Sequence, residues 1–235
     1  MNFESKSPSA GSRAFTLIEL LVVIAIIGVL AGLLLNGVMG VKRKAAGTQA
    51  RTDIAQIVAA INQFESTYSV MPCSKQVWDS SKNFSECHDF TYGTGAYRTY
   101  GSGNPPYIAD NSELISVLRA ASPTNKFESV ITALNPKKSV LIEPPLVSNT
   151  NAPGVGPDGV FRDPWGNPYI ISLDLDISGG VLDGVYGYSR LKTNGLPAEI
   201  PGRVAVWSLG PDGLADKNIP PNFGVNKDNI VSWEK

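Results

Sequence analysis

The sequence predicts an α+β protein in which a long N-terminal helix packs on a small antiparallel β-sheet. An unbroken apolar run covers residues 20–35, an apolar stripe of helical spacing follows in residues 50–68, and short strand-like segments occupy the C-terminal third. A long apolar run favours a helix, whereas alternation of apolar and polar residues is typical of half-buried strands. Because the helical pattern comes first and the strands come last, we expect a sheet packed on the helix.

The apolar run predicts a membrane-spanning helix, because no polar side chain occurs from Leu20 to Leu35. We place this helix at residues 15–41, after a short polar leader of residues 1–14. Glu19 is unusual, since an ionisable side chain costs about 3 kcal/mol near the centre of a bilayer. No Lys or Arg lies within the helix to pair with it. We therefore expect a cation from elsewhere, for which a free α-amino group is one candidate.

The N-terminal run differs from an ordinary signal peptide and from a plain signal anchor. A signal peptide would have a shorter apolar core with a small-x-small cleavage site after it. Here the apolar core is longer and the polar break precedes it. A plain anchor would need no carboxylate at position 19.

Small residues recur at every fourth position of the apolar helix. This stripe would allow a second helix to approach closely in lipid, although glycine is also simply common in membrane helices. The stripe consists of Gly28, Gly32, Asn36 and Gly40.

The second half of the same helix, residues 42–68, is predicted to be amphipathic and to lie on the folded domain. Its apolar stripe consists of Ala50, Ile54, Ile57, Ile61, Phe64 and Tyr68, and Pro72 ends the helix soon afterwards. Three basic residues begin this half at positions 42–44, and the positive-inside rule would place its C-terminal side in the cytoplasm. The leader carries few opposing charges, so the residues alone leave the topology open.

Residues 69–235 form the predicted globular part. Its first section, residues 69–110, is rich in Tyr, Gly, Ser and Pro, and we expect a loop region with one short strand. Further along, we predict two short helices, the first capped by Asn111, and four strands. These helices and strands cover residues 111–122, 127–134, 137–145, 169–175, 185–191 and 203–209. Residues 174–179 resemble the opening of a calcium-binding EF-hand loop, but Val185 occupies the position of the usual Glu, so we predict a hairpin turn.

Composition and motifs argue against catalysis and against nucleic-acid binding. The formal net charge is −1, with 20 basic and 21 acidic residues, and no basic patch is evident. The chain has one histidine, and it has no G-x-S-x-G, H-E-x-x-H or phosphate-binding glycine loop. We therefore expect neither an enzyme nor a DNA-binding protein.

The two cysteines, Cys73 and Cys87, lie fourteen positions apart in one turn-rich segment. In an oxidising compartment a disulfide between them would stabilise the fold by roughly 3 kcal/mol. Two unpaired thiols are the alternative. A metal site is a weaker hypothesis, because His88 is the only histidine of the chain.

The N-terminal segment AFTLIELLVVIAIIGVLAG resembles the prepilin signature of type IV pilins and of the pseudopilins of type II secretion. The resemblance implies cleavage between Ala14 and Phe15 by prepilin peptidase, followed by N-methylation of Phe15. It also implies that Glu19, at mature position five, takes part in assembly, together with packing at Gly28 and Gly32. The family usually has Gly before the cut, and Ala14 is the next smallest residue.

Two C-terminal segments resemble the major pseudopilin of type II secretion. The first is DPWGNPY, residues 163–169, whose local chemistry predicts a tight turn. The second combines LGPDGL, residues 209–214, with DNIVSW, residues 228–233. The resemblance implies a calcium site formed by the carbonyls of Leu209 and Leu214 and the carboxylates of Asp212 and Asp228.

This sequence departs from the calcium motif of the family in two ways. Asn229 stands where the family usually has a second Asp, and the loop before Asp228 is longer. Both departures weaken the expected affinity for calcium, because one negative charge is lost and the loop has more freedom. The alternative is that Asp212 and Asp228 only cap turns.

The resemblance as a whole implies a structural subunit of a type II secretion pseudopilus. Such a subunit would be a single-pass protein of the bacterial inner membrane, with its C-terminal domain in the periplasm. It would polymerise with copies of itself into a periplasmic filament, and its partners would be minor pseudopilins and the inner-membrane secretion platform. The alternatives are a type IV pilin for adhesion, motility or DNA uptake, and a membrane-anchored extracytoplasmic binding protein or enzyme.

Overall fold

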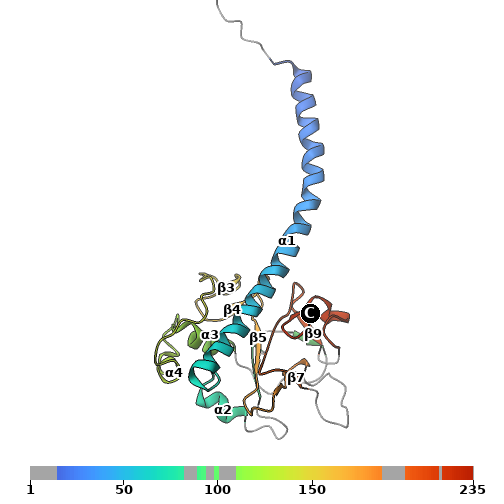
Figure 1. Cartoon of the computed structure of the whole chain (residues 1–235). Helices are drawn as coiled ribbons and strands as arrows, with labels where there is room; N and C mark the ends of the chain where they lie inside the picture. The colour runs from blue at the N-terminus through green and yellow to red at the C-terminus, as the bar shows by residue number, and fades with distance from the viewer. Residues whose placement is uncertain are drawn as a thin grey trace, which may run out of the picture. The chain divides into compact units, whose positions relative to one another are not determined.

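The computed structural model describes residues 15–81, 89–93, 98–100, 110–186, 199–216 and 219–234, without the side chains of residues 33–39 and 98–100. The chain divides into two units, residues 1–44 and residues 45–235 (Figure 1). The second unit contains both hydrophobic clusters of the described residues. The division into leader, membrane segment, amphipathic half and globular part stays a prediction.

Helix α1 runs from Leu17 to Tyr68, which confirms the prediction of one long helix. In the first unit, its apolar side chains from Leu17 to Leu30 are exposed, Leu17 to 84% and Val23 to 45%. In the part of the chain that the structure describes, no helix combines the length and the apolar character that crossing a membrane requires.

In the second unit, α1 buries the predicted apolar stripe. Ile57, Ile61 and Phe64 are fully buried, and Ile54 is nearly so. The three- and four-residue spacing places these side chains on one face of the helix, so that each contributes to the main core.

The main sheet is antiparallel and has the strand order β1-β5-β8-β10. Its strands are Phe90–Tyr92, Ile170–Leu173, Val204–Ser208 and Ile230–Val231. The central pair aligns Ile171 with Val206 and Ile170 with Trp207. The sheet confirms the predicted architecture, and the predicted strands at residues 169–175 and 203–209 are its two central strands.

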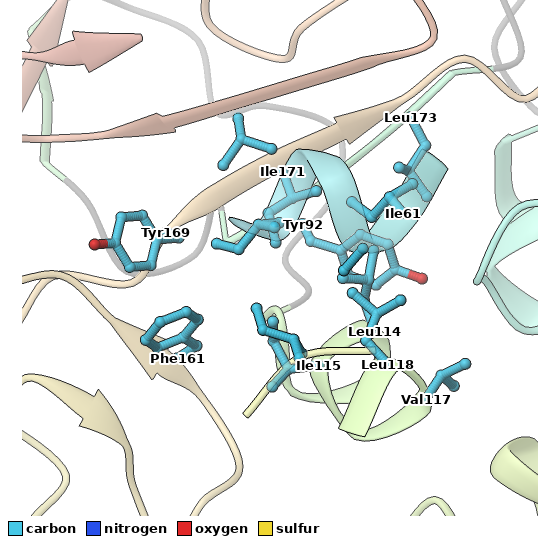
Figure 2. Close-up of a cluster of buried hydrophobic side chains, with 14 of the residues drawn as sticks. Ile61, Tyr92, Leu114, Ile115, Val117, Leu118, Phe161, Tyr169, Ile171 and Leu173 are labelled. Carbon is cyan, nitrogen blue, oxygen red and sulfur yellow. The ribbon is translucent and has the colours of Figure 1, made fainter. Parts of the chain in front are cut away.

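Both faces of the main sheet are covered, which explains why β5 is buried along its whole length. Ile171, Leu173 and Val206 belong to the main core with α1, α3 (Ser112–Arg119) and Phe161 (Figure 2). The alternate residues of the same strands, Ile170, Ala205 and Trp207, form a second cluster with Tyr186 and Ile200 on the other face. Because side chains alternate between the faces of a sheet, each strand contributes to both clusters.

The remaining elements are short. Helices α2, α4 and η3 cover Lys75–Ser81, Glu128–Leu134 and Gly224–Asp228. Strand β2 (Arg98–Tyr100) pairs in parallel with β9 (Leu214–Asp216). Strand β3 (Gly154–Val155) pairs with β4 (Phe161–Arg162), and β6 (Gly180–Val181) pairs with β7 (Ile200–Pro201), both antiparallel.

The strand predicted at residues 137–145 is wrong, since no named strand occurs there. The segment instead lies against the C-terminal end of α3, where the last carbonyls of a helix lack partners within the helix. The Leu141 N–H donates to the Leu118 carbonyl at 2.8 Å, and Asn135 Nδ2 donates to the Val117 carbonyl at 3.0 Å. Hydrogen bonds that we expected from a neighbouring strand are thus supplied by a helix end.

Three further expectations need correction. Helix α2 lies within residues 69–110, where the sequence predicts a loop region with one short strand. Val185 and Tyr186 do not begin a strand, because their N–H groups donate to the Asp183 carboxylate and turn the chain; residues 187–191 lie outside the described residues. Residues 174–179 form a turn but no hairpin, since β6 pairs with β7 rather than with β5.

The predicted cap of α3 is also wrong. The Asn111 side chain makes no capping bond. Its Nδ2 donates to the carbonyls of Phe161 (3.0 Å) and Tyr169 (2.8 Å), while its Oδ1 accepts from the Phe161 N–H at 2.9 Å. Asp110 Oδ1 instead accepts from the Ser112 N–H at 3.0 Å. Fully buried Asn111 therefore connects α3 to the two segments on either side of the 163–169 turn.

Replacement of Asn111 by alanine tests this connection. Asn111→Ala leaves buried backbone groups of Phe161 and Tyr169 without a partner, at about 1–3 kcal/mol each. We expect the free energy of unfolding to fall by about 3 kcal/mol in denaturant titrations of the full-length chain in detergent. Asn62→Ala, at an exposed position of α1, is the matched control. A loss no larger than that of the control would show that Asn111 is dispensable.

Candidate functional site

The N-terminus of α1 is closed by a capping box. The Glu19 carboxylate oxygen Oε2 accepts from the Thr16 N–H and from Thr16 Oγ1, both at 2.8 Å, and the Glu19 N–H donates to Thr16 Oγ1 at 3.3 Å. This is the reciprocal S/T-x-x-E pattern of helix N-termini. The Thr16-x-x-Glu19 pattern is visible in the sequence, where we interpret Glu19 as a carboxylate that needs a cation and as an assembly residue.

The other predicted N-terminal residues lie on an open surface. Phe15 is 79% exposed, while Ala14 lies outside the described residues, so the cleavage site is described on one side only. A β-carbon at Gly28 or Gly32 would meet no other atom within 4 Å. The exposed apolar face of α1 is therefore accessible to another helix, and cleavage, methylation and assembly at these residues stay predictions.

The C-terminal segments predicted to hold calcium do lie together. Strand β10 pairs with β8, so that Ile230 aligns with Ser208 and residues 228–229 lie next to the 209–214 loop. One end of the Asn229 side-chain amide lies 2.8 Å from the Leu209 carbonyl oxygen and 3.2 Å from that of Leu214. The two predicted carbonyl ligands therefore converge, and they converge on Asn229.

The two carboxylates of the predicted calcium site lie beside this convergence. Asp212 is exposed, and its Oδ1 accepts from the Leu214 N–H at 2.9 Å. Asp228 Oδ1 is buried and has no hydrogen-bond partner in the described part of the chain. Burial, and then the charge of Asp212, raise the pKa of Asp228. An orphaned carboxylate oxygen near a second carboxylate fits a cation, and carboxylates with carbonyls are the ligands that Ca²⁺ prefers.

The conformation of the loop depends on glycine. Gly210 has φ +66°, in the left-handed region, and a β-carbon there would overlap the Asp228 carbonyl oxygen. Its own carbonyl accepts from Asn167 Nδ2 at 2.9 Å. The close approach of the two C-terminal segments thus requires Gly210.

The 163–169 turn, which we predicted to be structural, connects three parts of the fold. Buried Asp163 accepts from the Trp165 and Asn167 N–H groups, each at 2.9 Å, and from Ser208 Oγ of β8 at 2.6 Å. Tyr169 Oη donates to Asp53 Oδ2 of α1 at 2.7 Å. Burial raises the pKa of both Asp53 and Asp163. The turn therefore joins α1, β8 and, through Asn167, the C-terminal loop.

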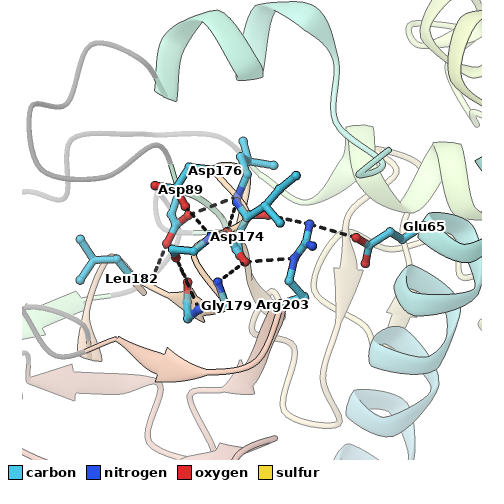
Figure 3. A network of polar contacts seen from close by, with 11 residues as sticks. Glu65, Asp89, Asp174, Asp176, Gly179, Leu182 and Arg203 are labelled. Atoms are coloured by element: carbon cyan, nitrogen blue, oxygen red, sulfur yellow. Dashed lines mark hydrogen bonds and ion pairs between the residues drawn. The ribbon is translucent and has the colours of Figure 1, made fainter. Parts of the chain in front are cut away.

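A second acidic cluster lies at the opposite end of β5 (Figure 3). Carboxylate oxygens of Asp89, Asp174 and Asp176 lie within 4.8 Å of one another. The Asp174 carboxylate is buried, accepts from the N–H groups of residues 177–179, and pairs with Arg203 Nε at 3.0 Å. Arg203 also pairs with Glu65 of α1 at 2.9 Å. Asp174 was considered from the sequence, whereas Asp89 was missed because nothing near it suggests this contact.

Asp89 holds the same loop from the other side. Its two carboxylate oxygens accept from the Leu175 N–H at 3.2 Å and the Leu182 N–H at 2.6 Å. Burial, together with the nearby charges of Asp176 and Asp174, raises its pKa from 3.8 to about 7. The carboxylates of Asp89 and Asp174 therefore hold the loop between β5 and β6 through its backbone N–H groups, and the pKa of Asp89 lies near neutral pH.

The raised pKa of Asp89 predicts that stability falls as pH rises. The folded state binds the Asp89 proton more tightly than the unfolded state does. The contribution of this proton to the free energy of unfolding is therefore complete below about pH 4 and is lost as the pH rises through 7. Between pH 5 and pH 8, we expect the unfolding midpoint of wild type to fall by roughly 5 °C more than that of Asp89→Asn. Thermal scans of the full-length chain at both values measure this difference.

Asp158→Asn is the control for this comparison. The hydrogen bond from Arg162 lowers the pKa of Asp158, so this residue is ionised in both states above pH 5. Its replacement leaves the pH slope unchanged over the tested range. Equal slopes for wild type and Asp89→Asn would contradict a proton held by Asp89.

The predicted disulfide involves one described residue. Cys73 is buried, and burial raises the pKa of its thiol to about 12. Cys87 lies outside the described residues, so the pair stays a prediction.

Comparison with known proteins agrees with the N-terminal geometry. Residues 9–35 match the prokaryotic N-terminal methylation motif. The chain is also similar to Type II secretion system core protein G from three bacteria. Identity is 34% over 87 residues in Klebsiella pneumoniae, 40% over 68 residues in Escherichia coli (strain K12) and 39% over 64 residues in Pectobacterium carotovorum subsp. carotovorum.

These matches cover part of each protein. They include 36%, 29% and 27% of this chain, and 62%, 47% and 41% of the respective relatives. The chain thus spans about half the length of the curated relatives it matches. No solved structure matches it.

The capped N-terminal helix, the methylation motif and the α+β domain are features that a pilin-like protein with a prepilin-type N-terminus would have. The similarity to the core protein G of type II secretion agrees with the resemblance to a pseudopilin in the N-terminal sequence.

Proposed function

We propose that the chain is a structural subunit of a type II secretion pseudopilus, assembled through its N-terminal helix. The observation that carries the proposal is the coincidence of the methylation motif at residues 9–35 with an exposed apolar helix surface from Leu17 to Leu30. So large an apolar surface requires lipid or other helices around it. Lipid covers this surface before assembly. After assembly, a filament core of bundled helices, formed by copies of this chain, covers it.

Processing and location follow from the same proposal. Prepilin peptidase removes residues 1–14, and the new amino group of Phe15 is methylated. The subunit is anchored in the inner membrane by residues 15–41, and its domain lies in the periplasm. The relatives are named as components of a secretion system rather than as enzymes, and we propose a structural role without catalysis. Minor pseudopilins and the inner-membrane platform are its further partners.

Glu19 provides the register between subunits. In the monomer, its carboxylate is held by the Thr16 capping box at the first turn of α1. This position keeps the carboxylate near the end of the helix, where the Phe15 amino group of a neighbouring copy can reach it. The pair would offset the cost of placing a carboxylate in an apolar environment.

Two substitutions of Glu19 separate its charge from its role in the cap. Glu19→Gln keeps a side chain that caps a helix but removes the charge, whereas Glu19→Val removes both. We expect both variants to be inserted in the membrane and cut before Phe15, as measured by intact mass. We also expect both to form at least tenfold fewer fibres than wild type, as counted by electron microscopy. A tenfold difference corresponds to about 1.4 kcal/mol.

Thr16→Val is the control, since it removes the hydroxyl of the cap and keeps the charge. Normal fibres from Glu19→Gln would mean that the cap, and not the ion pair, is what assembly needs. Normal fibres from Glu19→Val would reject a role for Glu19 in assembly. A protein that is not cut before Phe15 would reject the processing proposed here.

Calcium is a second part of the proposal. The residues around Asp228 fit the ion, since its buried Oδ1 is orphaned and Asp212 adds a second charge. When bound, the ion would neutralise these carboxylates, which lie beside the 209–214 loop. Asn229 contributes no charge, so we propose a low affinity, of the order of 10⁻⁴ to 10⁻³ M.

Thermal unfolding of the full-length chain in detergent tests calcium binding. A ligand that binds only the folded state stabilises it by RT ln(1 + [L]/Kd), so about 10 mM calcium raises the midpoint by roughly 3 to 6 °C. Asp212→Ala removes one carboxylate, and its midpoint should not respond. Asp110→Ala, distant in sequence, should respond as wild type does. Equal responses of wild type and Asp212→Ala, or no response in either, would show that the loop is only a turn.

A further inference from the structure

The Asn229 side chain lies against the carbonyl oxygens of Leu209 and Leu214. It is 4% exposed. One end of its amide faces the oxygens of Leu209 and Leu214, at 2.8 and 3.2 Å, and the other end lies 2.7 Å from Tyr186 Oη. Every atom that surrounds the amide at these distances is an oxygen.

The two ends of an amide differ, because the nitrogen has two hydrogens to donate and the oxygen only accepts. With its NH₂ toward the carbonyls, Asn229 gives one hydrogen to each, and Tyr186 Oη donates to its oxygen. With its oxygen toward the carbonyls, three acceptors meet without a hydrogen between them. The second arrangement requires a cation, whereas the first satisfies all four groups without one.

The neighbouring side chains hold Asn229 in place. Asn226 Nδ2 donates to the carbonyls of Asp216 and Ile219, and its Oδ1 accepts from the Asp216 N–H at 2.8 Å. The Asn229 N–H donates to the Asn226 carbonyl. On the other side, the Tyr186 ring packs edge-on against Trp207 at 4.9 Å and Trp233 at 5.7 Å. Asn229 is thus confined between the ordered end of η3 and an aromatic cluster.

We propose that the Asn229 amide substitutes for a bound cation, and that this chain closes its C-terminal loop without a metal ion. The NH₂ group bridges the same two carbonyls that an ion would bridge. A carboxylate at this position would place negative oxygens against them and would depend on an ion. Asn229 therefore determines whether closure requires metal. The inference concerns the unassembled domain and does not depend on fibre formation or on calcium binding at Asp228.

A single substitution tests the inference in the full-length chain in detergent. Asn229→Asp keeps the size of the side chain and replaces the two donors with an acceptor. In chelator, we expect its unfolding midpoint to lie roughly 5 °C or more below that of wild type, and calcium chloride to restore most of the difference. Asn62→Asp adds the same charge at an exposed position of α1 and should unfold as wild type does, with and without calcium.

A second measurement on wild type does not depend on the variant folding. In chelator, the Asn229 side-chain NH₂ protons, observed by NMR with ¹⁵N labelling, should exchange with solvent at least tenfold more slowly than those of exposed Asn62. The tryptophan emission maximum should be the same in chelator and in calcium, because Trp207 and Trp233 contact Tyr186 and would report any opening of this cluster.

Three results would overturn the inference. The first is rapid exchange of the Asn229 side-chain protons in chelator. The second is a fall of several degrees in the unfolding midpoint of wild type when calcium is removed to trace levels, together with a red shift of its tryptophan emission. The third is an Asn229→Asp variant whose unfolding midpoint in chelator equals that of wild type. A wild type that gains a few degrees in excess calcium but stays closed in chelator supports both this inference and calcium binding. A wild type that does not respond to calcium rejects only calcium binding.

Discussion

The burial of one face of α1 is the constraint on which the folded unit depends. Ile57, Ile61 and Phe64 supply the centre of the main core, and the same helix places Asp53 against Tyr169 and Glu65 against Arg203. Polar contacts therefore flank the apolar stripe and fix the helix relative to β5 and its adjoining turns. In the first unit, the apolar side chains of α1 from Leu17 to Leu30 are exposed. Within the residues that the structure describes, one helix thus carries two apolar surfaces, and the second of them is buried.

The main sheet transmits this constraint to the C-terminus. Because β5 and β8 are buried on both faces, their register is specified by two clusters at once. In the register that β10 takes beside β8, Ile230 joins the main core, whereas a one-residue slip would turn its side chain to the other face. That register brings Asn229 to the carbonyls of Leu209 and Leu214. The 163–169 turn supports the same arrangement, since Asp163 binds Ser208 and Asn167 binds the Gly210 carbonyl. The candidate site therefore depends on the sheet register as well as on Gly210 within the loop.

Features with a local signal could be predicted, and features that depend on distant pairing could not. The spacing of Ile54, Ile57 and Ile61 indicates a helix by itself, and alternation indicates β5 and β8. Strands β1 and β10, with three and two residues, are too short for any periodicity, and they exist only because β5 and β8 lie beside them. Asn111 has the sequence of a helix cap, yet its side chain serves two distant backbone segments. Residues 209–214 and 228 could be brought together from the resemblance, whereas the role of Asn229 follows from the position of Tyr186.

An amide or a carboxylate at position 229 determines whether the stability of the C-terminal segment depends on the concentration of a metal ion. An ion binds oxygen ligands strongly, but its contribution varies with its concentration as RT ln(1 + [L]/Kd). An amide that is part of the chain contributes two hydrogen bonds under all conditions, each worth less than an ion contact but independent of supply. With the two carbonyls already satisfied, the remaining attraction for a cation comes from Asp228 and Asp212, of which only Asp228 has an orphaned buried oxygen. Bound calcium would then adjust a closure that already exists, so that the C-terminal surface of the chain is the same with and without the ion.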